Sequence, residues 1–188
     1  MTLDSDLKKS IDVLNRGGLI LYPTDTVWGI GCDATNFDAV QKIFQLKQRE
    51  DSKTMICLVH HFDMLNNHVE VVPSIAKDVL DLAHKPTTII YDRPKHVAEN
   101  LIASDNTLAI RLIKHHFCES LIKRLKKPIV STSANISGQP TPKTFQEIET
   151  EILKGVDYVV NLGRDQMAAN PSSIIKLSNN GEVKVIRQ

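Results

Sequence analysis

Short apolar runs along the chain alternate with segments in which apolar residues recur at helical spacing. Apolar residues three or four positions apart put one face of a helix on a core, whereas short continuous runs are typical of buried strands. The helical spacing occurs in residues 7–14, 37–47, 75–82, 117–125 and 145–153. Continuous runs occupy residues 19–22, 55–59, 87–91, 108–112, 128–130, 158–160, 173–177 and 183–187. The pattern therefore predicts an α/β protein.

Glycines and capping residues indicate where several predicted helices begin and end. The pair Gly17-Gly18 ends the first helix. Asn36 and Ser74 stand just before apolar helical patterns, where their side chains can cap a helix N-terminus. We expect Lys47 to share a helix face with the apolar residues that follow Asn36.

The spacing of the predicted strands favours one irregular sheet. The strands are short, and the last ones follow one another with few helices between them. A regular doubly wound sheet needs a helix after nearly every strand, so we expect a twisted, open, mixed sheet. With 188 residues, of which 41% are hydrophobic, the chain fits one domain over residues 1–188. A domain of this length buries roughly 70% of its unfolded surface.

Charge is spread unevenly along the chain, although the net charge is only +1. Residues 1–94 carry 10 Lys/Arg and 13 Asp/Glu, whereas residues 95–188 carry 13 and 9. Residues 111–127 hold six of the basic residues. This basic stripe is either a solvated helix face or a footprint for phosphate or RNA.

Cysteine usage and the absence of long apolar segments suit the reducing cytoplasm. Cys32, Cys57 and Cys118 lie far apart and form no C-x-x-C pair. Cys57 falls in an apolar run, so we expect it in the core. The first residues contain no apolar signal region, and no apolar stretch approaches the length needed to span a membrane.

The segment from Gly29 to Ala34 fits G-x-G-x-x-A, which is part of the dinucleotide-binding fingerprint. That site needs its glycines where a strand meets a helix N-terminus. Here the strand ends near Tyr22 and the next helix begins after Asn36, so the glycines are misplaced for a dinucleotide. The chain also contains neither a P-loop G-x-x-x-x-G-K-[ST] nor a G-x-S-x-G nucleophile elbow.

Three polar loops follow or precede predicted strands. They are Pro23-Thr24-Asp25-Thr26, the segment 131–138 with sequence STSANISG, and Pro171-Ser172-Ser173. Each is either a turn that satisfies its own backbone or a group of donors for a ligand, since α/β sheets bind ligands beyond strand ends. Within the first loop, Asp25 is either a site residue or a turn anchor.

A cluster of cations closes the helix that follows Asn36. Lys47-Gln48-Arg49 stands at its end and Lys53 follows shortly after. Cations there complement the helix dipole, but three within seven residues also suit a polyphosphate.

Taken together and in order, these segments resemble the YrdC family, the threonylcarbamoyl-AMP synthases. That family shows P-T-[DE]-T-[VI]-[YF]-G-[LI], then K-x-R, a strand ending in Arg, S-x-N-x-S-G, P-S-T and a late Arg. The matching segments here are 23–30, 47–49, Arg111, 133–138, 171–173 and Arg187. The ordered set is much more specific than any of its members.

The resemblance implies an α/β fold with a twisted mixed sheet around a large, positively lined cavity. It implies the reaction of L-threonine, bicarbonate and ATP with Mg²⁺ to threonylcarbamoyl-AMP and pyrophosphate. A partner threonylcarbamoyl-transferase complex would then modify an adenosine in tRNA, and double-stranded RNA binding is also implied. Because the chain lacks the linker and extra domain of the longer branch, we expect the single-domain form.

The resemblance also implies roles for individual residues. Those expected to assist catalysis at the phosphates are Lys47, Arg49, Ser133 and Asn135. Further ATP contacts are expected at Lys53, Thr107, Thr141 and Arg187. L-Threonine is expected at Thr26, Arg111, Ser131 and Ser172, with Arg111 on its carboxylate.

This chain departs from the family pattern in several places. Glu50 replaces the proline of K-x-R-P, Ile113 replaces the proline after the strand arginine, and the loop 83–88 keeps only Pro86 and Thr88 of aromatic-P-G-P-x-T. Two rival hypotheses are a paralogous carbamoyl-transfer enzyme of the same fold and an RNA-binding or ribosome-maturation factor that uses the basic stripe.

Overall fold

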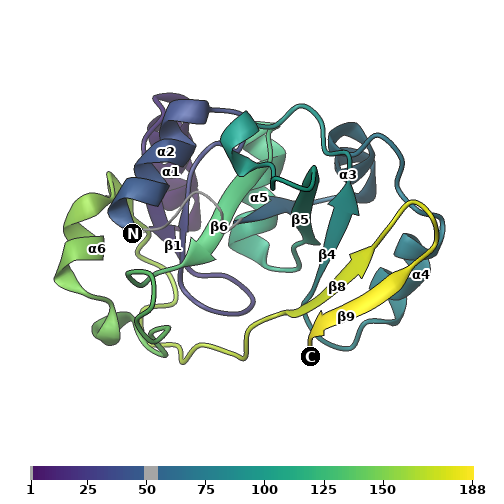
Figure 1. Ribbon diagram of the computed structural model, residues 1–188. Coiled ribbons are helices and arrows are strands. Elements are labelled where there is room, and N and C mark those ends of the chain that lie inside the picture. The colour runs from purple at the N-terminus through teal and green to yellow at the C-terminus, as the bar shows by residue number, and fades with distance from the viewer. Residues whose placement is uncertain (1, 49–54) are drawn as a thin grey trace.

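The computed structural model describes residues 2–48 and 55–188 (Figure 1). Within them, nine strands form one mixed sheet in the order β7-β1-β2-β6-β3-β5-β4-β8-β9. The strands are β1 (Ile20–Tyr22), β2 (Gly29–Gly31), β3 (Ile56–Val59), β4 (Thr87–Asp92), β5 (Thr107–Leu112), β6 (Ile129–Ser133), β7 (Tyr158–Val159), β8 (Ser173–Leu177) and β9 (Val183–Arg187). Pairs β1–β7, β3–β5 and β4–β8 are parallel, and the other pairs are antiparallel. The expected mixed sheet is confirmed.

Helices cover the sheet and extend beyond its ends. They are α1 (Leu3–Asn15), α2 (Phe37–Leu46), α3 (Phe62–His68), α4 (Ile75–Leu82), α5 (His116–Leu125) and α6 (Thr150–Gly155), with 3₁₀ turns η1 (Glu99–Leu101) and η2 (Phe145–Glu147). In Figure 1, α6 lies at the end of the sheet that carries β1, and α4 lies at the end that carries β8 and β9. No helix in the described ranges combines the length and apolar character that crossing a bilayer requires.

Two apolar cores lie on opposite faces of the sheet. In β1, Leu21 belongs to one core and its neighbours Ile20 and Tyr22 to the other, because successive strand residues point to opposite faces. The first core packs the sheet against α2, α3 and α4, and the second packs it against α1 and α5. Cys57 is fully buried in the first core, as expected, and burial raises the pKa of its thiol to about 12.

Several predicted boundaries differ from the structure. Helix α3 was not expected, because its seven residues bury only two side chains, Leu65 and His68, too few to give a periodic pattern. The single helix expected over 145–153 is divided into η2 and α6, because Ile148 and Glu149 adopt extended backbone ψ angles. Ser74 stands at the start of α4 but makes no capping hydrogen bond.

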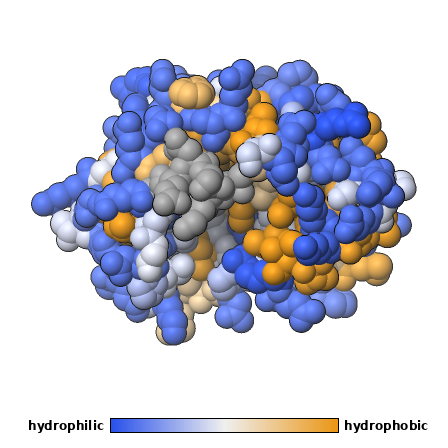
Figure 2. Space-filling view, in the orientation of Figure 1, coloured by the Kyte–Doolittle hydropathy of each residue, from blue (hydrophilic) through white to orange (hydrophobic). Residues whose placement is uncertain are grey.

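Exposed apolar side chains gather at the β9 end of the sheet. Figure 2 shows this patch over α4, β8 and β9. Its most exposed members are Leu82 of α4 and three residues of β9, namely Val183, Val185 and Ile186. Strand β9 is therefore an edge strand with half-exposed apolar residues.

The two glycines of the G-x-G segment lie inside β2, between β1 and β6. Neither has a positive φ, so backbone freedom does not explain why glycine stands at these positions. At Gly31, a Cβ atom would lie 2.5 Å from the carbonyl oxygen of Val130 and 2.7 Å from the ring of Tyr22. Glycine is needed there because the neighbouring strand and ring approach too closely for a side chain.

We expect Gly31→Ala to lower the free energy of unfolding by about 3 kcal/mol, since the atoms it meets include backbone. Gly29→Ala is the matched control, because its nearest neighbour is the Ser131 hydroxyl at 3.1 Å. The control should cost less than about 1 kcal/mol. Urea denaturation followed by circular dichroism measures both, and equal losses would contradict the close-approach explanation.

Candidate active site

A cavity of about 300 Å³ lies on the sheet face formed by β3, β4, β5 and β8. Apolar residues Ile56, Ile90, Ala109 and Ile174 come from those four strands. The rest of its wall is hydroxyl-rich and includes two arginines. Among the described residues that line it, none is acidic. A small concave site with few polar groups is the usual form of a ligand pocket.

The structure brings together residues that are far apart in the sequence. Seven of the residues expected in the site line this one cavity, namely Thr26, Arg111, Ser131, Ser133, Thr141, Ser172 and Arg187. They come from the loop after β1, from β5 and β6, from the loop after β6, from the segment before β8 and from β9.

The turn after β1 is organised by Thr24. Its hydroxyl donates to the carbonyl oxygen of Val27 at 2.7 Å and accepts the backbone N–H of Thr26 at 3.1 Å. Thr24 therefore supplies the self-satisfied turn, which leaves Asp25 and Thr26 free to turn toward the arginine of β5. Thr24 also lines the cavity, although sequence reasoning did not select it.

Arg111 is a buried cation at the centre of the site, with only 3% of its surface exposed. Its Nη2 lies 3.0 Å from Oδ1 of Asp25, and its Nη1 donates to the hydroxyl of Thr26 over 3.4 Å. The contact with Asp25 is an ion pair without hydrogen-bond alignment, and the buried Nε of Arg111 has no hydrogen-bond partner among the described residues. The guanidinium therefore keeps donor capacity for a ligand.

Ser172 joins three elements at the opposite wall. Its hydroxyl lies 2.8 Å from the hydroxyl of Thr88, which stands opposite Arg111 in the β4–β5 register. Nε of Arg187 donates to the carbonyl oxygen of Ser172 at 2.9 Å. Thr88 matches the threonine of the family's aromatic-P-G-P-x-T loop, but it was not predicted as a site residue. A hydroxyl inside a predicted strand does not by itself indicate a ligand contact.

A β-bulge aims Arg187 at the cavity. Ile174 pairs with Arg187 and Ile175 pairs with Val185, so Ile186 is an extra residue on β9. Without the extra residue, neighbouring side chains would alternate between faces. With it, both Ile186 and Arg187 line the cavity.

Lys47 ties the end of α2 to the loop after β6. It follows the last residue of α2, and only 1% of its surface is exposed. Its Nζ donates to the carbonyl oxygens of Ser133 and Asn135, and its own carbonyl accepts the N–H of Ser137. These bonds fix the loop that carries Ser133 and Asn135.

Asn135 is held by the same loop. Its Nδ2 donates to the carbonyl oxygens of Ile136 at 2.9 Å and Gln139 at 2.8 Å. Its buried Oδ1 has no hydrogen-bond partner in the described part of the chain. A buried acceptor of this kind is available to a ligand donor.

Of the five other expected site residues, Lys47, Asn135 and Thr107 do not line this cavity. Thr107 is buried at the start of β5, where its hydroxyl donates to Asp105 at 2.7 Å, and it does not line the cavity. Arg49 and Lys53 lie outside the described residues.

One member of the basic stripe is not on the surface. Arg111 is buried inside the site, whereas the other five basic residues of 111–127 are exposed. Of these, Lys127 pairs with Asp33 and Arg124 pairs with Asp4.

The back of the turn after β1 rests on the start of α5. The thiol of Cys118 lies 3.4 Å from both the carbonyl oxygen of Pro23 and Nδ1 of His115. Burial raises the pKa of Cys118, while burial lowers the pKa of His115 against the opposing effect of Asp25. Both groups are therefore neutral near pH 7 and support the turn without adding charge.

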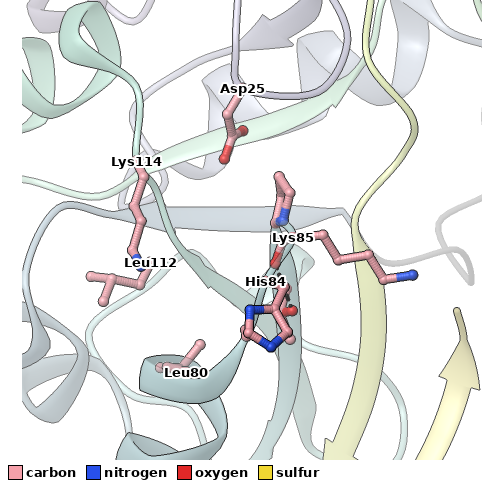
Figure 3. A pocket seen from close by; sticks show the side chains of 9 residues that line it. Asp25, Leu80, His84, Lys85, Leu112 and Lys114 are labelled. Atoms are coloured by element: carbon pink, nitrogen blue, oxygen red, sulfur yellow. Dashed lines mark hydrogen bonds between the residues drawn. The ribbon is translucent and has the colours of Figure 1, made fainter.

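A second cavity of about 250 Å³ lies beside the first one, and Asp25 lines it (Figure 3). Its other lining residues come from the end of α4, the loop 83–86, the first residue of β4 and the end of β5 and beyond. Asp25 therefore contacts Arg111 on one side and a separate space on the other.

The sequence of this chain is similar to a known protein family and to individual members with assigned names. The profile of the Sua5_yciO_yrdC family, described as "Telomere recombination", matches residues 12–188. The chain is similar to the threonylcarbamoyl-AMP synthase of Idiomarina loihiensis, with 36% identity over 88% of this chain and 90% of the relative. It is also similar to that of Shigella boydii, with 32% identity over 88% of this chain and 87% of the relative.

Solved structures share the fold. P. abyssi Sua5 complexed with L-threonine has a TM-score of 0.78 and 23% identity, over 91% of this chain and 50% of that one. E. coli YciO has a TM-score of 0.85 and 22% identity, over 100% of this chain and 90% of that one. The chain spans about half the length of the P. abyssi protein.

We expect Asp25→Asn to lower the free energy of unfolding by about 3 kcal/mol, because it leaves the buried Arg111 charge unpaired. The double variant Asp25→Asn/Arg111→Met, which removes both charges, should recover part of that loss. Chemical denaturation of the three proteins measures the coupling. Additive losses would show that the pair makes no net contribution.

Proposed function

The chain belongs to the Sua5/YciO/YrdC family, and from that premise we propose that it is an L-threonylcarbamoyladenylate synthase. Both curated relatives named above carry that activity in their names and match nearly nine-tenths of this chain. The reaction joins L-threonine, bicarbonate and ATP into threonylcarbamoyl-AMP with release of pyrophosphate. It is an AMP transfer and provides the first step of threonylcarbamoyladenosine synthesis in tRNA.

The observation that carries the proposal is the convergence of the cavity residues. Two arginines and several hydroxyls from six segments face one space with an apolar floor. Attack of a carbamate on the α-phosphorus of ATP needs positioning and charge neutralisation more than a covalent nucleophile. The cavity supplies those groups.

L-Threonine would lie against Thr26, Arg111, Ser131 and Ser172. The unpartnered Nε of Arg111 gives its carboxylate a charged donor in a buried position, where such bonds are strongest. The hydroxyls of Thr26 and Ser172 line the same cavity and would orient the carboxylate and the side-chain hydroxyl.

ATP would lie along the loop after β6. Ser133, Thr141 and Arg187 line that side of the cavity, and the Oδ1 of Asn135 is the nearby unpaired acceptor. Lys47 would act by holding this loop and by its charge, and Arg49 and Lys53 remain predicted phosphate contacts outside the described residues. Mg²⁺ would be carried by the phosphates, because no carboxylate in the described part of the chain lines the cavity.

Further proposals concern the setting of the enzyme. We infer a single catalytic domain that acts in the cytoplasm and passes its product to a threonylcarbamoyl-transferase complex. RNA binding, which the basic stripe suggested, remains a prediction. A paralogous carbamoyl-transfer enzyme of the same fold remains the alternative hypothesis.

A pyrophosphate assay tests the function. The protein with ATP, Mg²⁺ and bicarbonate should release pyrophosphate only when L-threonine is added, because the carbamate must form before the adenylation. Mass spectrometry of the product should show the threonylcarbamoyl adenylate. Pyrophosphate release that ignores L-threonine would reject this synthase activity.

Lys47→Met should lower the threonine-dependent rate by roughly 100-fold, because the variant removes a buried charge and the bonds that fix the loop of Ser133 and Asn135. Lys42→Met is the matched control. Lys42 lies on the same helix and also donates to a backbone carbonyl, that of Gly17 at 2.8 Å, away from the cavity. Equal losses in both variants would assign the effect to folding rather than to the site.

A further inference from the structure

Strand β9 leaves one edge of the sheet open. It stands last in the strand order, it pairs with β8 alone among the described strands, and residues 181–188 are all exposed. The side chains of Val183 and Val185 are about half exposed and belong to the apolar patch that Figure 2 shows. An open apolar edge of this kind is a template for pairing with another strand.

The geometry of the β8–β9 hairpin indicates which backbone groups of β9 face outward. The N–H of Ser178 donates to the carbonyl oxygen of Glu182 at 3.0 Å, so these two residues form a hydrogen-bonded pair. Hydrogen-bonded and non-hydrogen-bonded pairs alternate along an antiparallel ladder. Lys184 is therefore bonded to β8, whereas the N–H and carbonyl groups of Val183 and Val185 point away from β8. These outward groups are available to a strand of another chain.

The side chains of β9 separate into an apolar face and a charged face. Val183 stands opposite Leu177, which belongs to the first core, so Val183 and Val185 lie on the α4 face of the sheet. Glu182 and Lys184 lie on the other face, because successive strand residues alternate. Neither of these two charged groups forms an ion pair with a described residue.

We propose that β9 pairs with β9 of a second copy of this chain, antiparallel and centred on Val183. In this register Val183 lies opposite Val183 of the copy, and their outward N–H and carbonyl groups bond across the two-fold axis. Glu182 lies opposite Lys184 of the copy, and Lys184 lies opposite Glu182 of the copy. Opposite charges placed in this way stabilise a strand pair. The contact therefore matches both unpaired charges of the strand, twice by symmetry.

The neighbouring registers fit less well. Outward backbone groups must meet outward groups, so the centre of the pairing can move only by whole residues along β9. Centring on Glu182 or on Lys184 places like charges directly opposite each other, which is destabilising. Centring on Val185 places Lys184 opposite Ile186 and leaves both charges unmatched. The charge pattern therefore selects the register centred on Val183.

Features that usually protect an edge strand do not prevent this contact. Bulges and lysines commonly protect edges. The bulge at Ile186 lies beyond the residues that would pair, and Lys184 meets a carboxylate rather than another cation. Gly181 lies opposite Val185 of the copy and has no side chain to obstruct it. The joined sheet also carries Leu82 of both copies on one face, because the two-fold axis is perpendicular to the sheet.

Sedimentation velocity measures the association. Because the paired segment is short, we expect a weak dimer, with the weight-average mass rising from one chain at about 5 µM toward two chains at about 500 µM. A protein that stays monomeric over this range would overturn pairing with a second copy and leave the edge to a strand of another protein.

Charge reversal tests the register. Glu182→Lys and Lys184→Glu should each raise the dimer dissociation constant roughly tenfold or more, because like charges then meet at both pairs. An equimolar mixture of the two variants, and the double variant Glu182→Lys/Lys184→Glu, should return association to within about threefold of wild type, because opposite charges meet again. Losses that neither combination restores would overturn the register.

Lys8→Glu is the matched control for the charge change. Lys8 is an exposed lysine of α1, which packs beside β1 and β7 at the other end of the sheet. The control should change the dissociation constant by less than about twofold, since exposed charges far apart are screened. An effect equal to that of Lys184→Glu would assign the change to net charge and overturn the pairing.

Amide hydrogen exchange locates the contact on the backbone. The N–H groups of Val183 and Val185 should exchange several-fold more slowly at the higher protein concentration, because they become hydrogen-bonded in the dimer. The N–H of Lys184 should be protected at both concentrations, since β8 already accepts it. A dimer that leaves Val183 and Val185 unprotected would place the contact on another surface and contradict the proposal. Circular dichroism of each variant confirms that the protein compared is folded.

Discussion

The site depends on the ion pair between Arg111 and Asp25. A guanidinium that is 3% exposed needs a nearby negative charge, because the desolvation of an unpaired ion costs several kcal/mol. Asp25 provides that charge from the turn after β1, so the pair fixes the turn against β5. The hydroxyl of Thr26 is placed by the same contact. The burial of the cation and the placement of Asp25 and Thr26 in the turn therefore depend on one group of contacts.

Around this pair, polar groups are positioned mainly by contacts between segments that are distant in sequence. The Ser172 hydroxyl is fixed by Thr88, and the loop after β6 is fixed by Lys47 from the end of α2. Such cross-links let short loops carry a rigid site on a sheet whose strands have only two to six residues. The same arrangement places the carboxylate of Asp25 against Arg111 of the first cavity and in the wall of the second.

The sequence was sufficient for the parts of the structure that depend on local pattern. Apolar runs predicted the described strands except β2, and the resemblance to the family predicted seven residues that line the cavity, including Thr26, Arg111 and Ser172. It failed where register between distant strands decides the outcome. The contact of Thr88 with Ser172 needs the β4–β8 pairing, and the need for glycine at Gly31 comes from the close approach of β1 and β6. Thr107 donates to Asp105 and does not line the cavity, so its expected contact with ATP stays a prediction.

The bulge at Ile186 has a consequence for how the chain tolerates insertions and deletions. Side-chain direction in a strand is a matter of parity, so the count of residues in β9 decides which face Arg187 occupies. Deleting one residue from this hairpin would keep the arginine in the sequence yet send its side chain to the α4 side of the sheet. The number of residues in the hairpin is therefore as important for the cavity as the identity of Arg187. A deletion that retains every polar residue can still remove the arginine side chain from the cavity wall.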